Sequence, residues 1–165
     1  MKISSLLAFV WLALWAGPAH AQDIYDGCNQ PWGTSLNTSQ DFTEDKGAWG
    51  SGNSFAPPNE VKYFRKNFGQ PGIFDKGTVY YETVDGKLSA IKATIQKGTT
   101  DDYKKIVEMA AATCKCQATA SALSWKARCA GITAWAANGP NVIFWIENDE
   151  LAGKARQHVN KARGY

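Results

Sequence analysis

Three of the four cysteines lie in one short stretch, CKCQATASALSWKARC, which runs from Cys114 to Cys129, and the fourth is Cys28. Cysteines can hold a metal, exchange electrons or form disulfides. A structural zinc site needs four ligands in closely spaced Cys or His pairs, and this chain has one such pair, Cys114 and Cys116, and no Cys-x-x-Cys redox motif. In an exported protein an even number of cysteines indicates disulfides. We therefore expect two disulfides and no metal site.

Four cysteines allow three pairings. A bond between Cys114 and Cys116 closes a very small, strained ring, so Cys28 is expected to pair with one of these two residues and Cys129 with the other. Cys114 falls on the apolar stripe of an expected helix, which favours Cys114–Cys129 together with Cys28–Cys116. The pairing with the partners exchanged stays open. The longer bridge closes a loop of about 90 residues and stabilises the fold by about 4 kcal/mol on a chain-entropy estimate.

The carboxylates Glu147, Asp149 and Glu150 cluster where an expected strand meets an expected helix. Carboxylates at such a place can act in glycoside hydrolysis or hold a cation, although they also suit a helix cap and an acidic first turn. His158 is the one histidine after the N-terminal leader, and a position near the end of the last helix explains it without function. These four residues are the catalytic candidates. Spacing does not choose their carboxylate partner among Glu60, Glu82 and Glu108.

The segment 22–59 is rich in Gly, Ser, Asn, Thr and Pro and has no sustained hydrophobic period. We expect an irregular segment tethered by Cys28. Asn37 begins a glycosylation sequon. Single aromatic residues on such a segment can anchor a partner or cover the disulfides. The candidate binding residues are Trp32, Phe42, Trp49 and Phe55.

The N-terminus has the layout of a secretory signal peptide. Lys2 precedes an apolar run, and Ala19-His20-Ala21 supplies small residues for cleavage after Ala21. The run is too short to span a bilayer, and no second run of sufficient length follows. We therefore expect a secreted or periplasmic protein without a membrane span. Its formal charge is +3 with the leader, and basic residues are scattered among acids, which argues against a nucleic-acid partner.

Residues 60–165 have the pattern of a single α+β domain. Asp85-Gly86 separates two runs of β-formers, which is a strong hairpin signal, and Thr99 with Asp102 forms a capping box ahead of an apolar stripe with helical spacing. The expected elements are a strand within 61–68, a hairpin of strands at about 78–84 and 88–96, helices at about 100–114 and 120–137, a strand at about 141–147 and a final helix at about 149–162.

The two-residue turn sets the expected register of the hairpin, with Val84 opposite Lys87 and Tyr80 opposite Ile91. The run NVIFWIE at 141–147 is apolar almost throughout, so we expect a central strand buried on both faces. The apolar face of the hairpin then comprises Tyr80, Val84, Ile91, Ala93 and Ile95.

No phosphate-binding loop, dinucleotide-binding fingerprint or nucleophile elbow occurs in the sequence. We therefore expect no cofactor, and we favour a binding role over an enzymatic one: a small exported protein that binds another protein, as an inhibitor or immunity protein does, through the aromatic residues of segment 22–59. One alternative is a secreted toxin or effector. A further alternative is a small hydrolase that uses the carboxylates near Glu147. The sequence does not specify the oligomeric state.

Overall fold

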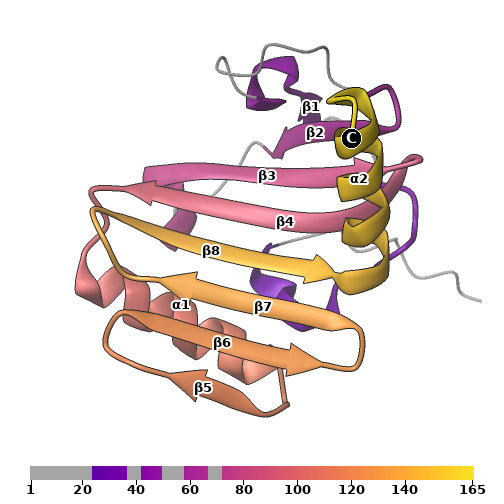
Figure 1. Cartoon of the computed structure of the whole chain (residues 1–165). Helices are drawn as coiled ribbons and strands as arrows, with labels where there is room; N and C mark the ends of the chain where they lie inside the picture. Colours follow the sequence, from indigo (N-terminus) through magenta and orange to yellow (C-terminus); the bar gives the residue numbers. More distant parts are fainter. Residues whose placement is uncertain (1–23, 37–41, 50–57, 67–71) are drawn as a thin grey trace, which may run out of the picture.

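The computed structural model describes residues 24–36, 42–49, 58–66 and 72–165. Within these residues one sheet is built from eight strands: β1 (Phe42–Glu44), β2 (Val61–Lys66), β3 (Gly77–Val84), β4 (Lys87–Gln96), β5 (Ala118–Ala120), β6 (Ser124–Cys129), β7 (Ile132–Ala137) and β8 (Asn141–Asn148). Their order is β1-β2-β3-β4-β8-β7-β6-β5, and every pair is antiparallel. Two four-stranded meanders therefore meet where β4 pairs with β8 (Figure 1).

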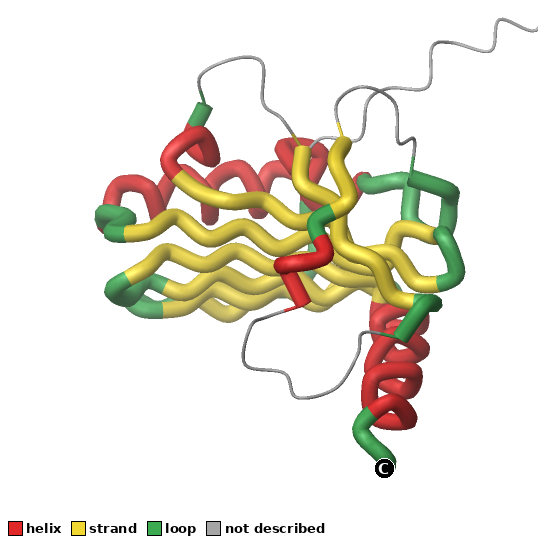
Figure 2. Tube along the Cα trace, turned by 90° about the horizontal axis from the view of Figure 1, so that it is seen from above, coloured by secondary structure: helices red, strands yellow, loops and turns green. Residues whose placement is uncertain are grey.

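The two meanders are each followed by an α-helix, and the helices cover opposite faces of the sheet (Figure 2). The helices are α1 (Thr100–Thr113), α2 (Asp149–Ala162) and the 3-10 helices η1 (Ile24–Asn29), η2 (Lys46–Trp49) and η3 (Ile73–Lys76). The first helix, α1, packs on β7 and β8 together with η1 and η3, whereas α2 packs on β2, β3, β4 and β8. Figure 1 shows that α2 leaves β6, β7 and much of β8 uncovered on its own face.

The α+β class is confirmed, although the protein contains more sheet than the sequence pattern predicts. The main core lies between α1 and the sheet, where Ile106 and Ala110 of α1 meet Phe144 and Ile146 of β8, all fully buried.

The capping box predicted for α1 is present, because the Asp102 backbone N–H donates to Thr99 Oγ1 at 3.2 Å and the Thr99 backbone N–H donates to Asp102 Oδ2 at 2.8 Å. The C-terminal helix begins and ends where the sequence predicts it.

The turn of the β3–β4 hairpin is also confirmed. Asp85 and Gly86 both have positive φ, at 51° and 74°, as a two-residue hairpin turn with the favoured twist requires. Val84 pairs with Lys87 as expected. The pairing of Tyr80 with Ile91 is wrong, however.

A β-bulge between Glu82 and Thr83 causes this difference. The extra residue is Ser89 of β4, since Glu82 pairs with Ala90 and Thr83 pairs with Leu88, and it shifts β4 by one residue, so Tyr80 pairs with Lys92 and Tyr81 pairs with Ile91. A shift of one residue moves a side chain to the other face of the sheet. As a result Tyr81 is fully buried in the core, and Tyr80 lies on the face that carries α2.

The helix expected at 120–137 is wrong. This stretch forms β5, β6 and β7, and its burial alternates, with Trp125 and Ala127 buried while Lys126 and Arg128 are exposed. Gly131 has a φ of +74° in the turn between β6 and β7, a conformation that favours glycine and interrupts a helix. The strand at 141–147 is confirmed as β8 in the middle of the sheet. Only its α1 face is fully buried, because its other face is half-buried.

The disulfides join Cys28 to Cys114 and Cys116 to Cys129. Two disulfides are thus confirmed, but the favoured pairing is wrong. That preference assumed a second helix beside α1, whereas β6 brings Cys129 to Cys116 instead. Gly27 lets η1 reach the end of α1, since a Cβ on Gly27 would clash with the Thr113 side chain.

The proposed signal peptide, residues 1–21, lies outside the described residues. Segment 22–59 contains η1, β1 and η2 in its described parts, and β1 joins the edge of the sheet by pairing with β2. Among the described residues, no helix has both the length and the apolar character needed to cross a membrane.

Candidate functional site

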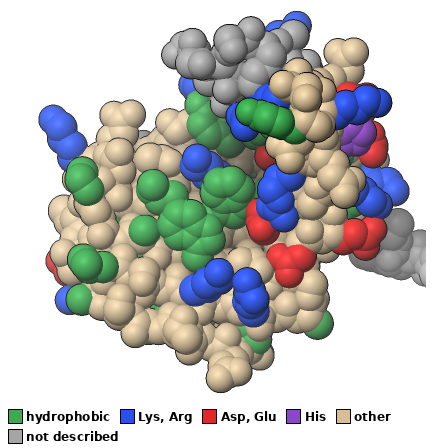
Figure 3. All heavy atoms as spheres, in the orientation of Figure 1, with side chains coloured by type: hydrophobic (Ala, Val, Ile, Leu, Met, Phe, Trp, Pro, Cys, Tyr) green, Lys and Arg blue, Asp and Glu red, His purple; other side chains and the backbone are tan. Residues whose placement is uncertain are grey.

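A single row of side chains crosses the sheet on the face that α2 leaves partly open. Residues paired across antiparallel strands point to the same face, and the pairing continues through six adjacent strands, from β2 to β6. We call these residues the cation–aromatic row: Arg65, Tyr80, Lys92, Trp145, Trp135 and Lys126. Figure 3 shows hydrophobic side chains gathered on the uncovered sheet beside α2, with basic side chains around them.

Three of the five neighbouring pairs in the row contact one another through their side chains. The Arg65 guanidinium lies 5.8 Å from the centroid of the Tyr80 ring, and Lys92 Nζ lies 5.2 Å from the centroid of the Trp145 ring. Both distances are within the range of cation–π attraction. Trp145 and Trp135 stack with centroids 6.4 Å apart and an interplanar angle of 19°. The row is therefore held in place by its own contacts.

Two hollows adjoin the row. One, of about 210 Å³, lies on the sheet between Tyr80, Lys92 and Trp145. The other, of about 330 Å³, lies between the sheet and α2 and is bordered by Glu147 and Arg156. The residues that line both hollows are Tyr63, Glu82 and Trp145.

The two hollows contain two carboxylates with opposite electrostatic surroundings. Glu82 accepts hydrogen bonds from Ser89 Oγ at 2.9 Å and from the Tyr63 hydroxyl, yet burial raises the pKa of Glu82 above its ordinary value. Burial also raises the pKa of Tyr63, with a further contribution from the Glu82 charge. Glu147 accepts from Arg156 at 3.2 and 3.3 Å. The carboxyl of Glu82 is therefore buried and bonded to two hydroxyls, whereas the carboxyl of Glu147 is paired with a guanidinium.

The structure separates the predicted catalytic candidates. Glu147 lies at the α2 hollow, whereas Asp149 and Glu150 form the first turn of α2. Asn148 caps that helix by accepting from the Leu151 backbone N–H at 3.0 Å, and Glu150 pairs with Lys154 at 2.9 Å. The cap and first-turn interpretation thus accounts for two of the three carboxylates. The carboxylate that the fold brings near Glu147 is Glu82.

His158 is half-buried on α2. Within the described part of the chain, it is not among the residues that line either hollow, although Val159 and Asn160 border the one under α2. Among the described residues, therefore, no histidine lies beside the two carboxylates.

Two of the candidate binding residues in segment 22–59 pack onto the protein body. Trp32 is half-buried against the main core, and its Nε1 donates to the Cys28 carbonyl at 3.4 Å. Phe42 packs edge-on against Tyr81, with ring centroids 4.9 Å apart. Trp49 ends η2, but its side chain lies outside the described residues, as does all of Phe55.

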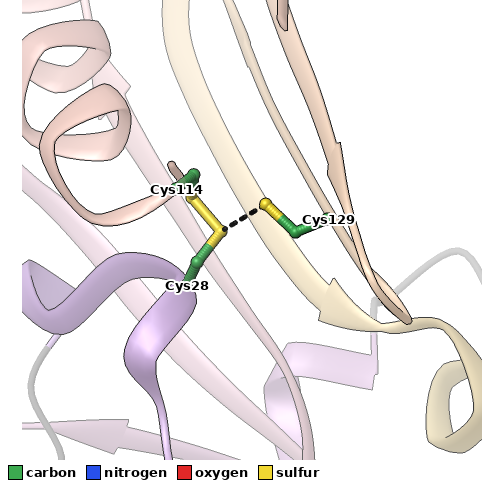
Figure 4. A group of neighbouring side chains, drawn as sticks. All are labelled: Cys28, Cys114 and Cys129. Atoms are coloured by element: carbon green, nitrogen blue, oxygen red, sulfur yellow. Dashed lines mark hydrogen bonds between the residues drawn. A yellow bond between two sulfur atoms is a disulfide. The ribbon is translucent and has the colours of Figure 1, made fainter. Parts of the chain in front are cut away.

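Three of the cysteine sulfurs meet beside η1 (Figure 4). The sulfurs of Cys28, Cys114 and Cys129 all lie within 4.8 Å of one another. Each of the four cysteines belongs to a disulfide. Because metal binding requires thiolates, the cross-linked form offers a structural junction here.

The cation–aromatic row was not identified from the sequence. The sequence pattern predicts a helix around Trp135 and places Tyr80 on the apolar face of the hairpin. A partial signal is present in β7 and β8, where buried apolar residues alternate with Thr133, Trp135, Trp145 and Glu147. The rest of the row depends on pairing between distant strands.

Comparison with known proteins gives no assignment, since no protein family matches the sequence, no curated protein matches it and no solved structure matches the chain. Fold alone does not define function. Function is therefore inferred from the open sheet face and the two hollows beside it.

Proposed function

We propose that this protein is an exported binding protein of the inhibitor or immunity type, which occupies a partner protein with the open face of its sheet. The observation that carries this proposal is the cation–aromatic row. It places one aromatic or cationic side chain on each of six adjacent strands and spans about 24 Å at the usual strand spacing.

The composition of the row suits protein recognition. Trp, Tyr and Arg are the residue types most often found at energetic hot spots of interfaces, and the row contains Trp135, Trp145, Tyr80 and Arg65. Their mutual stacking limits the side-chain entropy that is lost on binding. A cross-linked fold is consistent with an extracellular or periplasmic location.

The test begins with capture of a partner from the extracellular or periplasmic fraction, followed by calorimetry with the purified partner. We expect Trp135→Ala to weaken the complex about tenfold or more, as loss of a hot-spot aromatic does. Leu123→Ala is the matched control, because Leu123 is 68% exposed in the turn before β6 and outside the row. Equal affinity of the wild type and Trp135→Ala would contradict the proposal.

A growth assay separates this function from a toxin or effector. An immunity protein is harmless when supplied alone and protects a susceptible cell from the toxin that it binds. A toxin inhibits growth by itself. Growth inhibition by the purified protein, abolished in Trp135→Ala, would replace the binding proposal with the toxin alternative.

A second candidate function, a small carboxylate-dependent hydrolase, is favoured by one observation. Glu82 and Glu147 border one hollow, where burial raises the pKa of Glu82 and Arg156 pairs with Glu147, and hydrolases use two carboxyls in unlike environments as acid and as base or nucleophile. The check is a hydrolysis screen on glycans and peptidoglycan with the wild type, Glu82→Gln and Glu147→Gln. Wild-type activity that both variants lose would support the hydrolase function. A wild type without activity on these substrates would contradict it.

A further inference from the structure

We infer that the open face selects an acidic, extended segment of the partner protein, whose carboxylates bind Lys92 and Lys126. This inference rests on the proposed function, because it names the chemistry of the partner that the cation–aromatic row would recognise. Charge, ring orientation and spacing each support it.

The cations of the row are only partly neutralised. Arg65 already pairs with Asp45 at 2.7 Å. Lys92 and Lys126 are exposed, and neither forms an ion pair within the described part of the chain. Two ammonium groups on one face therefore remain available for carboxylates.

The acidic residues of the same face do not compensate these two lysines. Glu147 is already paired with Arg156. Glu82 is held by Ser89 and Tyr63, and its raised pKa disfavours the charged form. The open half of the face is therefore positively charged around Lys92 and Lys126, which complements an acidic partner.

The orientation of Trp145 argues against sugars or bases as ligands. Lys92 lies over the ring from the β4 side, and Trp135 stacks on it from the β7 side. Lys92 and Trp135 thus compete with a sugar or a base for stacking on Trp145. The ammonium groups of Lys92 and Lys126 favour carboxylates.

The spacing of the two lysines defines the acidic segment. Lys92 on β4 and Lys126 on β6 are separated by β8 and β7, which places them about 14 Å apart at the usual strand spacing. In an extended chain, side chains about four residues apart are separated by about 13 Å. A segment that crosses the strands can therefore place two carboxylates, about four residues apart, on the two lysines.

The test uses a short synthetic peptide with two glutamates in that spacing and a second peptide with glutamines in their place. Titration is followed by tryptophan fluorescence, since Trp145 adjoins Lys92. We expect the glutamate peptide to bind and the glutamine peptide to bind about tenfold more weakly or not at all. Binding should also weaken as salt is raised, because exposed charges are screened.

Two double variants locate the binding. Lys92→Glu with Lys126→Glu should weaken binding of the glutamate peptide about tenfold or more. Lys104→Glu with Lys105→Glu changes the same number of charges on exposed positions of α1, on the opposite face, and should leave binding within about twofold. Lys92→Gln with Lys126→Gln is the milder pair to use if the charge reversals do not fold. Equal losses in the row and α1 variants would overturn the inference in favour of nonspecific attraction.

Two further probes identify the ligand class. Tighter binding of oligothymidylate or of oligogalacturonate than of the glutamate peptide, at matched charge, would overturn the inference in favour of a nucleic acid or an acidic polysaccharide. Failure of the glutamate peptide to bind would also overturn it. The proposed function has a separate outcome. If the affinity for a captured partner depends on Trp135 but not on salt, Lys92 or Lys126, the binding role is retained and the acidic segment is rejected.

Discussion

The sulfur of Cys129 lies 3.9 Å from the sulfur of Cys28, although the two atoms belong to different disulfides. Cys28 comes from η1, and Cys129 ends β6, so the contact joins the N-terminal segment to the far half of the sheet (Figure 4). Disulfides exchange when a thiolate attacks a neighbouring disulfide sulfur. A free thiol at Cys129 would have such a sulfur within reach.

We predict that Cys116→Ser produces two disulfide isomers. The variant leaves Cys129 as a thiol, and its thiolate attacks Cys28 Sγ. A Cys28–Cys129 bond forms, the Cys28–Cys114 bond breaks, and Cys114 leaves as a thiolate that takes up a proton from water. The exchange needs no external oxidant. Alkylation after an acid quench, followed by peptide mapping, should find the free thiol on both Cys114 and Cys129.

The matched control is Cys129→Ser, which leaves the free thiol on Cys116 instead. Cys116 is outside the group of three mutually close sulfurs. This variant should therefore keep Cys28–Cys114 as its single bridge. The prediction is wrong if Cys116→Ser, held at about pH 8.5 where thiols begin to ionise, also contains only Cys28–Cys114.

The environment of Glu82 predicts a specific pH dependence of stability. Burial raises the pKa of Glu82 in the folded protein above its ordinary value of 4.5, so the folded state binds this proton more tightly than the unfolded state does. The stabilisation is fully present below about pH 4.5 and is lost as the pH rises through the folded pKa. Glu82→Gln cannot titrate. Urea unfolding across this range should show the wild type losing free energy of unfolding relative to the variant.

Glu150→Gln provides a control of opposite sign. Pairing with Lys154 lowers the pKa of Glu150, so its contribution is present above the unfolded pKa and is lost as the pH falls through the folded value. The difference between this variant and the wild type should therefore grow with rising pH in favour of the wild type. Parallel pH profiles for the wild type and Glu82→Gln would show that Glu82 titrates normally.

Trp32 tests whether the N-terminal aromatic residues bind a partner or support the core. Because Trp32 packs on the main core and donates to the Cys28 carbonyl, Trp32→Ala should lower the free energy of unfolding by about 2 kcal/mol, which is less than for a fully buried tryptophan. Chemical denaturation measures this. Unchanged stability together with a weakened partner complex would instead make Trp32 an interface residue, as the sequence analysis proposes.

Local signals predicted part of the fold well. The Asp85-Gly86 turn and the Thr99–Asp102 capping box depend on residues that are close in sequence, and both are found in the structure. The helix at 149–162 likewise combines an Asn148 cap with an acidic first turn. Elements that carry their own start and stop residues can be predicted because neighbouring residues determine their backbone conformation.

Long-range features could not be predicted in the same way. Whether Tyr80 shares a face with Ile91 depends on the bulge at Ser89, and the alignment of Lys92 with Trp145 depends on pairing between the two meanders. The apolar residues between 120 and 137 satisfy a helical period and an alternating period at once, because Trp125, Ile132 and Ala136 fit both. The positive φ of Gly131 decides between them in the structure.

Gly131 and Gly153 provide a final pair of predictions with opposite signs. Gly131 has a φ of +74° in the β6–β7 turn, and nothing lies within 4 Å of an added Cβ, so Gly131→Ala is opposed by backbone strain alone, which costs about 1–2 kcal/mol. Gly153 lies inside α2 with the same open space around its Cβ position, so Gly153→Ala should stabilise the protein by about 0.5–1 kcal/mol. Thermal or urea unfolding of the two variants measures both changes. If Gly131→Ala instead stabilises the protein, this stretch is helical and the β6–β7 hairpin, with Trp135 on the open face, is wrong.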